Sequence, residues 1–81
     1  MEKWKVVGYR SVNFKDQNTG KQVSGYSMFL ARKPETPDIV GLEMQKIFIS
    51  SDYVNYIPVE NQMIGLNYNR YGKVQSIEVL G

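Results

Sequence analysis

The chain of 81 residues contains no cysteine and no histidine. Without cysteine there is no disulfide, no thiolate nucleophile and no zinc–thiolate site, and without histidine the usual catalytic triads and dyads are excluded as well. Three carboxylates lie close together in the sequence, Glu35, Asp38 and Glu43. They lack the spacing of a calcium-binding loop and are expected to be solvated. We therefore expect a protein that is not an enzyme and that uses no metal and no cofactor.

Long apolar runs are also missing. No stretch approaches the ~20 apolar residues that cross a membrane. The start of the chain carries Glu2, Lys3 and Lys5 where a signal peptide would be apolar. These features predict a soluble, cytoplasmic protein without membrane contact. Residues 1–81 are expected to form a single domain, and its core must be thin because a chain this short buries only ~60% of its unfolded surface.

The net charge of +2 is distributed unevenly along the chain. Residues 1–33 carry seven basic and two acidic side chains, whereas residues 34–66 carry one basic and five acidic side chains. Such a division is typical of a protein with one surface that faces a polyanion. A mixed, solvated surface remains the alternative, because segments of the sequence need not coincide with regions of the surface.

The hydrophobic pattern predicts strands, since no window of helical length keeps apolar residues at three- and four-residue spacing. Two turns contain a glycine suited to a left-handed backbone, Gly20 and Gly72. We expect one helical turn, or else a compact loop, at residues 51–56, and an exposed loop where two prolines follow Lys33. The expected strands cover residues 4–14, 23–32, 42–51, 63–68 and 74–80.

Strict alternation along the first strand predicts one apolar face, which includes Trp4, Val6, Val12 and Phe14. Trp4 is expected in the core. The other face would carry Tyr9 together with Lys3, Lys5, Ser11 and Asn13 as a flat platform on which a base could stack, or Tyr9 would form a cross-strand aromatic pair. Arg10 interrupts the apolar face, so it is expected to mark a bend or to pair with a carboxylate such as Glu78.

The second and third strands are partly apolar on both faces. Tyr26, Met28 and Leu30 alternate with Ser27, Phe29 and Ala31, and Ile47 and Ile49 alternate with Met44, Lys46 and Phe48. A thin core cannot cover both faces, so a homodimer is expected. Tyr53 and Tyr56 lie in the acidic segment and are expected to pack or to form an interface. Five short strands predict an all-β protein, first of all a small five-stranded OB-like barrel, with an SH3-like barrel or an open meander as alternatives.

The hairpin tip at residues 69–73 presents an aromatic ring between two cations. The turn itself needs only Gly72, so Arg70, Tyr71 and Lys73 are free for another role. Bases that stack on a ring while phosphates meet the cations are a common mode of holding single-stranded nucleic acid. A tyrosine without any function in a turn is the other interpretation.

Two short motifs resemble the single-stranded-DNA-binding proteins of filamentous bacteriophages and related proteins of plasmids and integrative elements. The segment from Gln17 to Ser27 is similar to that family's Gly-Lys-Pro-Tyr-Ser stretch, and Arg70-Tyr71-Gly72-Lys73-Val74 is similar to its aromatic hairpin tip. The resemblance implies an OB-like, dimeric, helix-destabilising protein that coats DNA. Two differences limit it: Tyr26 is farther from Gly20 than in the family, and the loop at residues 34–41 has no counterpart.

The sequence therefore predicts a non-enzymatic protein that binds single-stranded nucleic acid, DNA rather than RNA, with little base preference, in phage or mobile-element replication. The rival interpretation is a small β-barrel that contacts another protein, as an adaptor or a structural component of a phage. Phosphate contacts are expected from Lys3, Lys5, Lys21, Arg32, Lys46, Arg70 and Lys73, and stacking from Tyr9, Tyr26, Phe48 and Tyr71.

Overall fold

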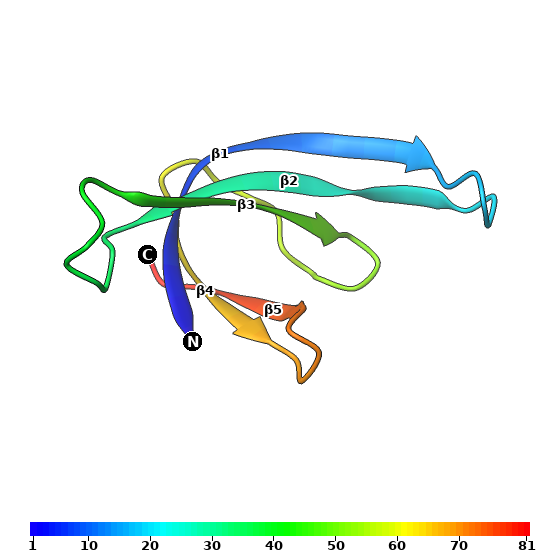
Figure 1. Ribbon diagram of the computed structural model, residues 1–81. Coiled ribbons are helices and arrows are strands. Elements are labelled where there is room, and N and C mark those ends of the chain that lie inside the picture. The colour runs from blue at the N-terminus through cyan, green and yellow to red at the C-terminus, as the bar shows by residue number, and fades with distance from the viewer.

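A computed structural model describes residues 1–81 as one antiparallel sheet of five strands without a helix. All five expected strands are confirmed, with ends that differ by at most two residues. None of the elements is a helix long and apolar enough to cross a membrane. In chain order the strands are β1 (Glu2–Lys15), β2 (Gln22–Arg32), β3 (Glu43–Ser50), β4 (Met63–Tyr68) and β5 (Val74–Val79) (Figure 1).

The strand order is β3-β2-β1-β4-β5, so β3 and β5 are the two edges of the sheet. The sheet curls over itself because the first residues of β1 pair with β4, while the longer remainder pairs with β2. As a result β4 and β5 lie beneath the layer of β1, β2 and β3 (Figure 1). The edges do not pair with each other, and a closed barrel is therefore not formed.

A β-bulge at Val7 divides β1 into two parts. Even-numbered side chains point to the core before the bulge, and odd-numbered side chains point to the core side after it. Val6 lies opposite Leu30 and Gly8 lies opposite Phe29, so Val7 has no partner in β2. An extra residue reverses the alternation of all side chains that follow it. The prediction of one continuous apolar face from Trp4 to Phe14 is therefore wrong.

Two further expectations for β1 change with the bulge. Tyr9 lies opposite Met28 on the side of the core, whereas Lys3 and Lys5 alternate with buried Trp4 and face away from it. The expected platform of Tyr9 with these two lysines is thus not formed. Arg10 is exposed and forms no ion pair, so the proposed pairing with Glu78 is wrong. The irregularity of β1 lies at Val7, whereas Arg10 pairs regularly with Ser27.

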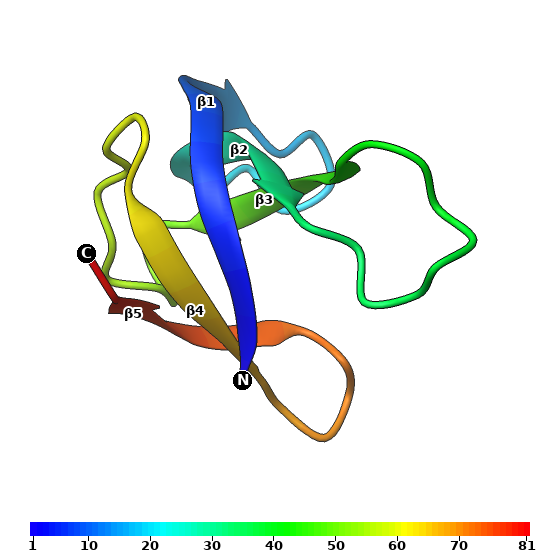
Figure 2. The same cartoon turned by 90° about the vertical axis from the view of Figure 1, so that its left-hand side faces the viewer.

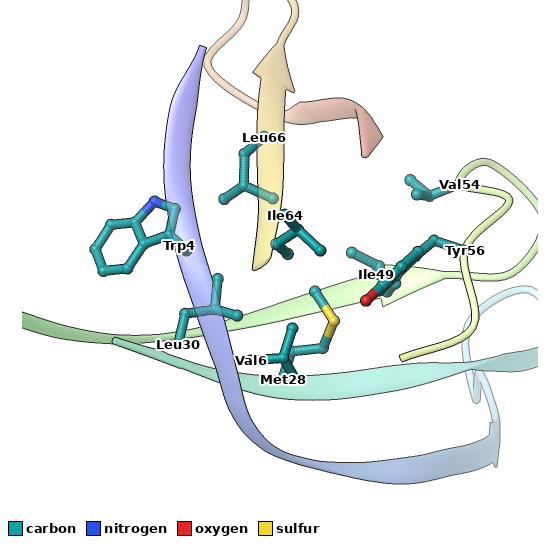
Figure 3. Packing of buried hydrophobic residues seen from close by; sticks show 9 residues of the cluster. All are labelled: Trp4, Val6, Met28, Leu30, Ile49, Val54, Tyr56, Ile64 and Leu66. Atoms are coloured by element: carbon teal, nitrogen blue, oxygen red, sulfur yellow. The ribbon is translucent and has the colours of Figure 1, made fainter. Parts of the chain in front are cut away.

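The core lies between the two layers. It is formed by apolar side chains that alternate along β1, β2, β3 and β4, and it is closed by Val54 and Tyr56 from the loop after β3 (Figure 3). The expected burial of Trp4 and the expected packing of Tyr56 are both confirmed. The fully buried side chains of the sheet are Val6, Met28, Leu30, Ile49, Ile64 and Leu66.

The loops agree with the expected turn chemistry. Gly20 and Gly72 adopt φ values of 72° and 78°, in the left-handed region that the sequence predicts. After β3 the backbone N–H groups of Tyr53 and Val54 both donate to the Ser50 carbonyl, and the bond from Val54 closes one helical turn that does not continue into a helix. The expected single turn is therefore confirmed, and the side chain that accepts from a backbone N–H group at its start is that of Ser50, not Ser51 or Asp52.

A polar cluster ties the start of β1 to β4 and β2. Glu2 Oε1 accepts hydrogen bonds from Trp4 Nε1 at 3.0 Å and from the Tyr68 hydroxyl at 2.8 Å. The Arg32 guanidinium lies 4.2 Å from the centre of the Trp4 ring and donates to Glu43 at 3.1 Å. The hydrogen bonds that Glu2 accepts from Tyr68 and Trp4 lower the pKa of Glu2. The pKa of Tyr68 is raised, mainly by burial and to a smaller extent by its hydrogen bond to Glu2.

The lowered pKa of Glu2 predicts a specific loss of stability in acid. A carboxyl that is more acidic in the folded chain stabilises it fully above its unfolded pKa of about 4.3, and that contribution disappears as the pH falls through the folded pKa. We expect the free energy of unfolding of Glu2→Gln to depend less on pH below about 5 than that of the parent. Urea denaturation at several pH values measures this, and a Glu2→Gln variant with the same pH dependence as the parent would contradict it.

Candidate nucleic-acid interface

The side of β1, β2 and β3 that faces away from the core, here called the outer face, carries exposed rings beside cations. Phe29 on β2 lies opposite Lys46 on β3, whose Nζ is 5.7 Å from the centre of the ring. Phe48 projects from β3 on the same face, in the row that contains Ser27 and Arg10. Both rings are more than a third exposed. The expected outward direction of Phe48 and Lys46 is confirmed.

A glycine on the neighbouring strand leaves the space that the Phe48 ring occupies. A Cβ atom at Gly25 would lie 2.9 Å from that ring and 2.0 Å from the Ile49 carbonyl oxygen. At Gly8 a Cβ atom would be 3.6 Å from the Phe29 ring, which is an ordinary contact, so Phe29 does not require a glycine there. The Phe48 ring therefore lies low on the sheet, where an extended ligand could pass over it.

Phe48 also borders a hollow between the two edges of the sheet, here called the seam hollow. It has a volume of about 770 Å³ and lies between the end of β3, the turn after it, and the tip of the β4–β5 hairpin. Phe48 and Tyr53 supply rings, while Lys73, Asn69 and Gln75 supply polar groups. Its volume is within the range of ligand pockets, and it combines the two kinds of group that hold a nucleotide.

At the opposite end of the outer face lies a second depression, here called the basic pocket. Its volume is about 750 Å³, and its lining includes Lys3, Lys5 and Lys33. The pairing of Lys5 with Ala31 and of Ala31 with Met44 places this pocket one row beyond Phe29 and Lys46. The outer face thus has cations at both ends and rings between them.

The hairpin tip is built as the sequence predicts. The side-chain oxygen of Asn69 accepts hydrogen bonds from the backbone N–H groups of Tyr71 and Lys73, at 2.9 and 3.1 Å. The Tyr71 side chain is 72% exposed. The Arg70 guanidinium carbon lies 5.0 Å from the centre of that ring, and Nη2 of the same guanidinium donates a hydrogen bond to the Tyr71 hydroxyl at 2.8 Å. Arg70 and Tyr71 therefore form a unit at the tip, while Lys73 belongs to the seam hollow.

The remaining candidate residues lie elsewhere. Tyr9 and Tyr26 pair edge to face, 6.3 Å apart, on the side opposite the outer face. This is the cross-strand pair that the sequence allowed as the alternative for Tyr9. Arg32 is engaged by Trp4 and Glu43, and the hydrogen bond to Glu43 raises its pKa. Lys21 lies at the far end of the long β1–β2 hairpin (Figure 1).

Three rings near the interface were not among the candidates. Phe29 lies in the middle of the outer face, Phe14 extends that face along the β1–β2 hairpin, and Tyr53 lines the seam hollow. Phe29 could have been selected, because its alternation with Met28 and Leu30 already placed it opposite the core. Phe14 reaches this face only because of the bulge, and Tyr53 reaches the hollow only because two sheet edges meet there. No sequence pattern predicts the bulge or the meeting of the edges.

Comparison of the chain with protein-family models, with curated proteins and with solved structures finds no match.

Proposed function

We propose that the protein is a non-enzymatic binder of single-stranded nucleic acid, DNA in preference to RNA, with little base preference. The observation that carries the proposal is the position of Phe48, which belongs to both the outer face and the seam hollow. Lys46 lies beside it on β3, and Lys73 lies across the hollow. A strand could stack its bases on Phe29, Phe48 and Tyr53 while its phosphates meet these two cations.

The topology supports this placement. The observed strand order is that of an OB barrel opened between β3 and β5. OB folds can be partly open, so the unpaired edges are compatible with an OB-like arrangement. OB folds bind oligonucleotides on the face of their second and third strands and on the loops that follow the first and fourth strands. The outer face and the β4–β5 tip are the corresponding places in this chain, so we infer an OB-like binding mode.

A role in the replication of a phage or a mobile element follows from the same proposal. Replication of such elements exposes single strands of every sequence, and a protein that stacks on rings without reading base edges suits them. The resemblance of the Gly20 and Tyr71 segments to the filamentous-phage proteins agrees with this role.

The proposal predicts a binding affinity that falls as salt rises. Each phosphate contact on a single strand contributes a slope of about −0.7 to the logarithm of affinity against the logarithm of salt concentration. We expect Lys46→Ala and Lys73→Ala each to reduce the slope by about 0.7, because each removes one such contact. Fluorescence titration with oligothymidine at several salt concentrations measures the slope, and Lys33→Ala, which lines the pocket at the opposite end of the outer face and not the seam hollow, is the matched control.

Two results would contradict the proposal. One is an absence of binding to oligothymidine at low salt. The other is binding whose slope is the same in the parent, Lys46→Ala and Lys73→Ala, which would show that neither cation meets a phosphate. Either result would favour the rival function, in which Phe29, Phe48 and Tyr53 contact another protein, because an aromatic protein interface depends little on salt.

A further inference from the structure

The basic pocket differs chemically from the seam hollow. No aromatic ring lines it, and its apolar part consists of aliphatic and thioether groups such as those of Met1, Leu42 and Met63. Four cations, Lys3, Lys5, Arg32 and Lys33, surround this floor together with one carboxylate, Glu35, so the pocket keeps an excess of positive charge. None of the three lysines forms a salt bridge. A base would find no ring on which to stack there. The lining instead fits a ligand that combines aliphatic groups with negative charge.

The chain itself carries a segment with that chemistry, in the loop between β2 and β3 at residues 33–42. Glu35 and Asp38 supply negative charge, and Ile39 and Val40 supply aliphatic groups. Val40 is 98% exposed, the greatest exposure of any large apolar side chain. Figure 2 shows this loop standing away from the sheet. Ile39 and Leu42 are exposed as well, and several exposed apolar side chains on one short loop form the kind of patch that marks an interaction site.

The backbone of the loop is equally unpartnered. Apart from the ladders of the strands, no main-chain hydrogen bond of the chain involves residues 33–42. The loop therefore keeps its own donors and acceptors free for a partner, and its charged and aliphatic side chains complement the basic pocket.

We propose that this loop of one copy docks in the basic pocket of a second copy, and that the second copy reciprocates. Three residues of the loop, Lys33, Glu35 and Leu42, themselves line the pocket of their own copy, while Asp38, Ile39 and Val40 at the middle of the loop do not. Loop and pocket thus form one continuous patch, which is what a two-fold interface requires, since the same surface must be complementary to itself. The apolar contact excludes water from Val40, and the opposite charges fix the register.

The test uses reversed charges and contains no nucleic acid, so its outcome is independent of the proposed function. The pocket variant is Lys3→Glu/Lys5→Glu, and the loop variant is Glu35→Lys/Asp38→Lys. All four side chains are exposed, so both variants should fold, which circular dichroism verifies. We expect the parent to be a dimer in sedimentation velocity, and each variant alone to dimerise at least about tenfold more weakly, because like charges then face each other at both contacts.

An equimolar mixture of the two variants is the decisive measurement. In a heterodimer the unchanged loop meets the unchanged pocket and the reversed loop meets the reversed pocket, so we expect dimerisation to return to within about threefold of the parent. A matched variant, Val40→Ser, should weaken the dimer without a change in charge. The proposal is overturned by a monomeric parent, by variants that dimerise as the parent does, or by a mixture that remains monomeric.

Discussion

Alanine at Gly25 is expected to destabilise the protein by about 3 kcal/mol or more, at the upper end of the range for overpacked sites. A Cβ atom there would lie 2.0 Å from the Ile49 carbonyl oxygen, a backbone atom of the neighbouring strand. Only a displacement of β3 from β2 could relieve this overlap. A domain of this size has a total stability of roughly 4–12 kcal/mol, so a substantial part of it would be lost.

Gly8→Ala is the matched control for this prediction. A Cβ atom at Gly8 would have its nearest neighbour at 3.6 Å, in the Phe29 ring, which is an ordinary contact distance. We expect Gly8→Ala to keep the parental stability within about 1 kcal/mol, because the unfolded chain also loses freedom when glycine is replaced. Urea denaturation of both variants gives the two free energies of unfolding. Equal values for the two would show that β2 and β3 are not as closely apposed at Gly25 as the structure has them.

The positions of the strands could be predicted from the sequence because each strand is bounded by residues with a strong local preference. Gly20 and Gly72 take left-handed conformations, and the prolines after Lys33 cannot continue a ladder. The division of β2 into a core face with Met28 and Leu30 and an opposite face with Phe29 was also correct, because that strand has no irregularity. Local chemistry is therefore sufficient for these features.

The bulge at Val7 could not be predicted, since it depends on how β1 bends to pair with both β2 and β4. It reverses the facing of every later residue in β1, and so it transfers Tyr9 to the core side. The seam hollow was beyond prediction for a related reason. It joins Phe48, on the edge strand β3, to Lys73, in the turn before the other edge strand β5 and 25 positions later in the chain. Strand order cannot be derived from alternation alone.

Phe48→Ala is expected to cause the largest loss of binding among single substitutions in the interface. A base that stacks on a protein ring contributes about 1–3 kcal/mol, so the affinity for oligothymidine should fall by about 5- to 150-fold. Phe48→Tyr keeps a ring and should bind nearly as the parent does, whereas Phe48→Leu keeps the apolar bulk but offers no π-face and should resemble alanine. Stability should change little, because the ring is half-exposed.

Variants of Tyr71 and Tyr9 show which surface of the protein the bound nucleic acid follows. Tyr71→Ala should weaken binding by about 1–3 kcal/mol if the nucleic acid extends to the hairpin tip, because a stacked ring is then lost. Stability should hardly change, since the Tyr71 side chain is 72% exposed. Tyr9→Ala should leave the affinity unchanged, because that ring pairs with Tyr26 on the side opposite the outer face. If Tyr9→Ala weakens binding while Phe48→Leu binds as tightly as the parent, the strand passes over the pair of tyrosines, and the outer face has another role.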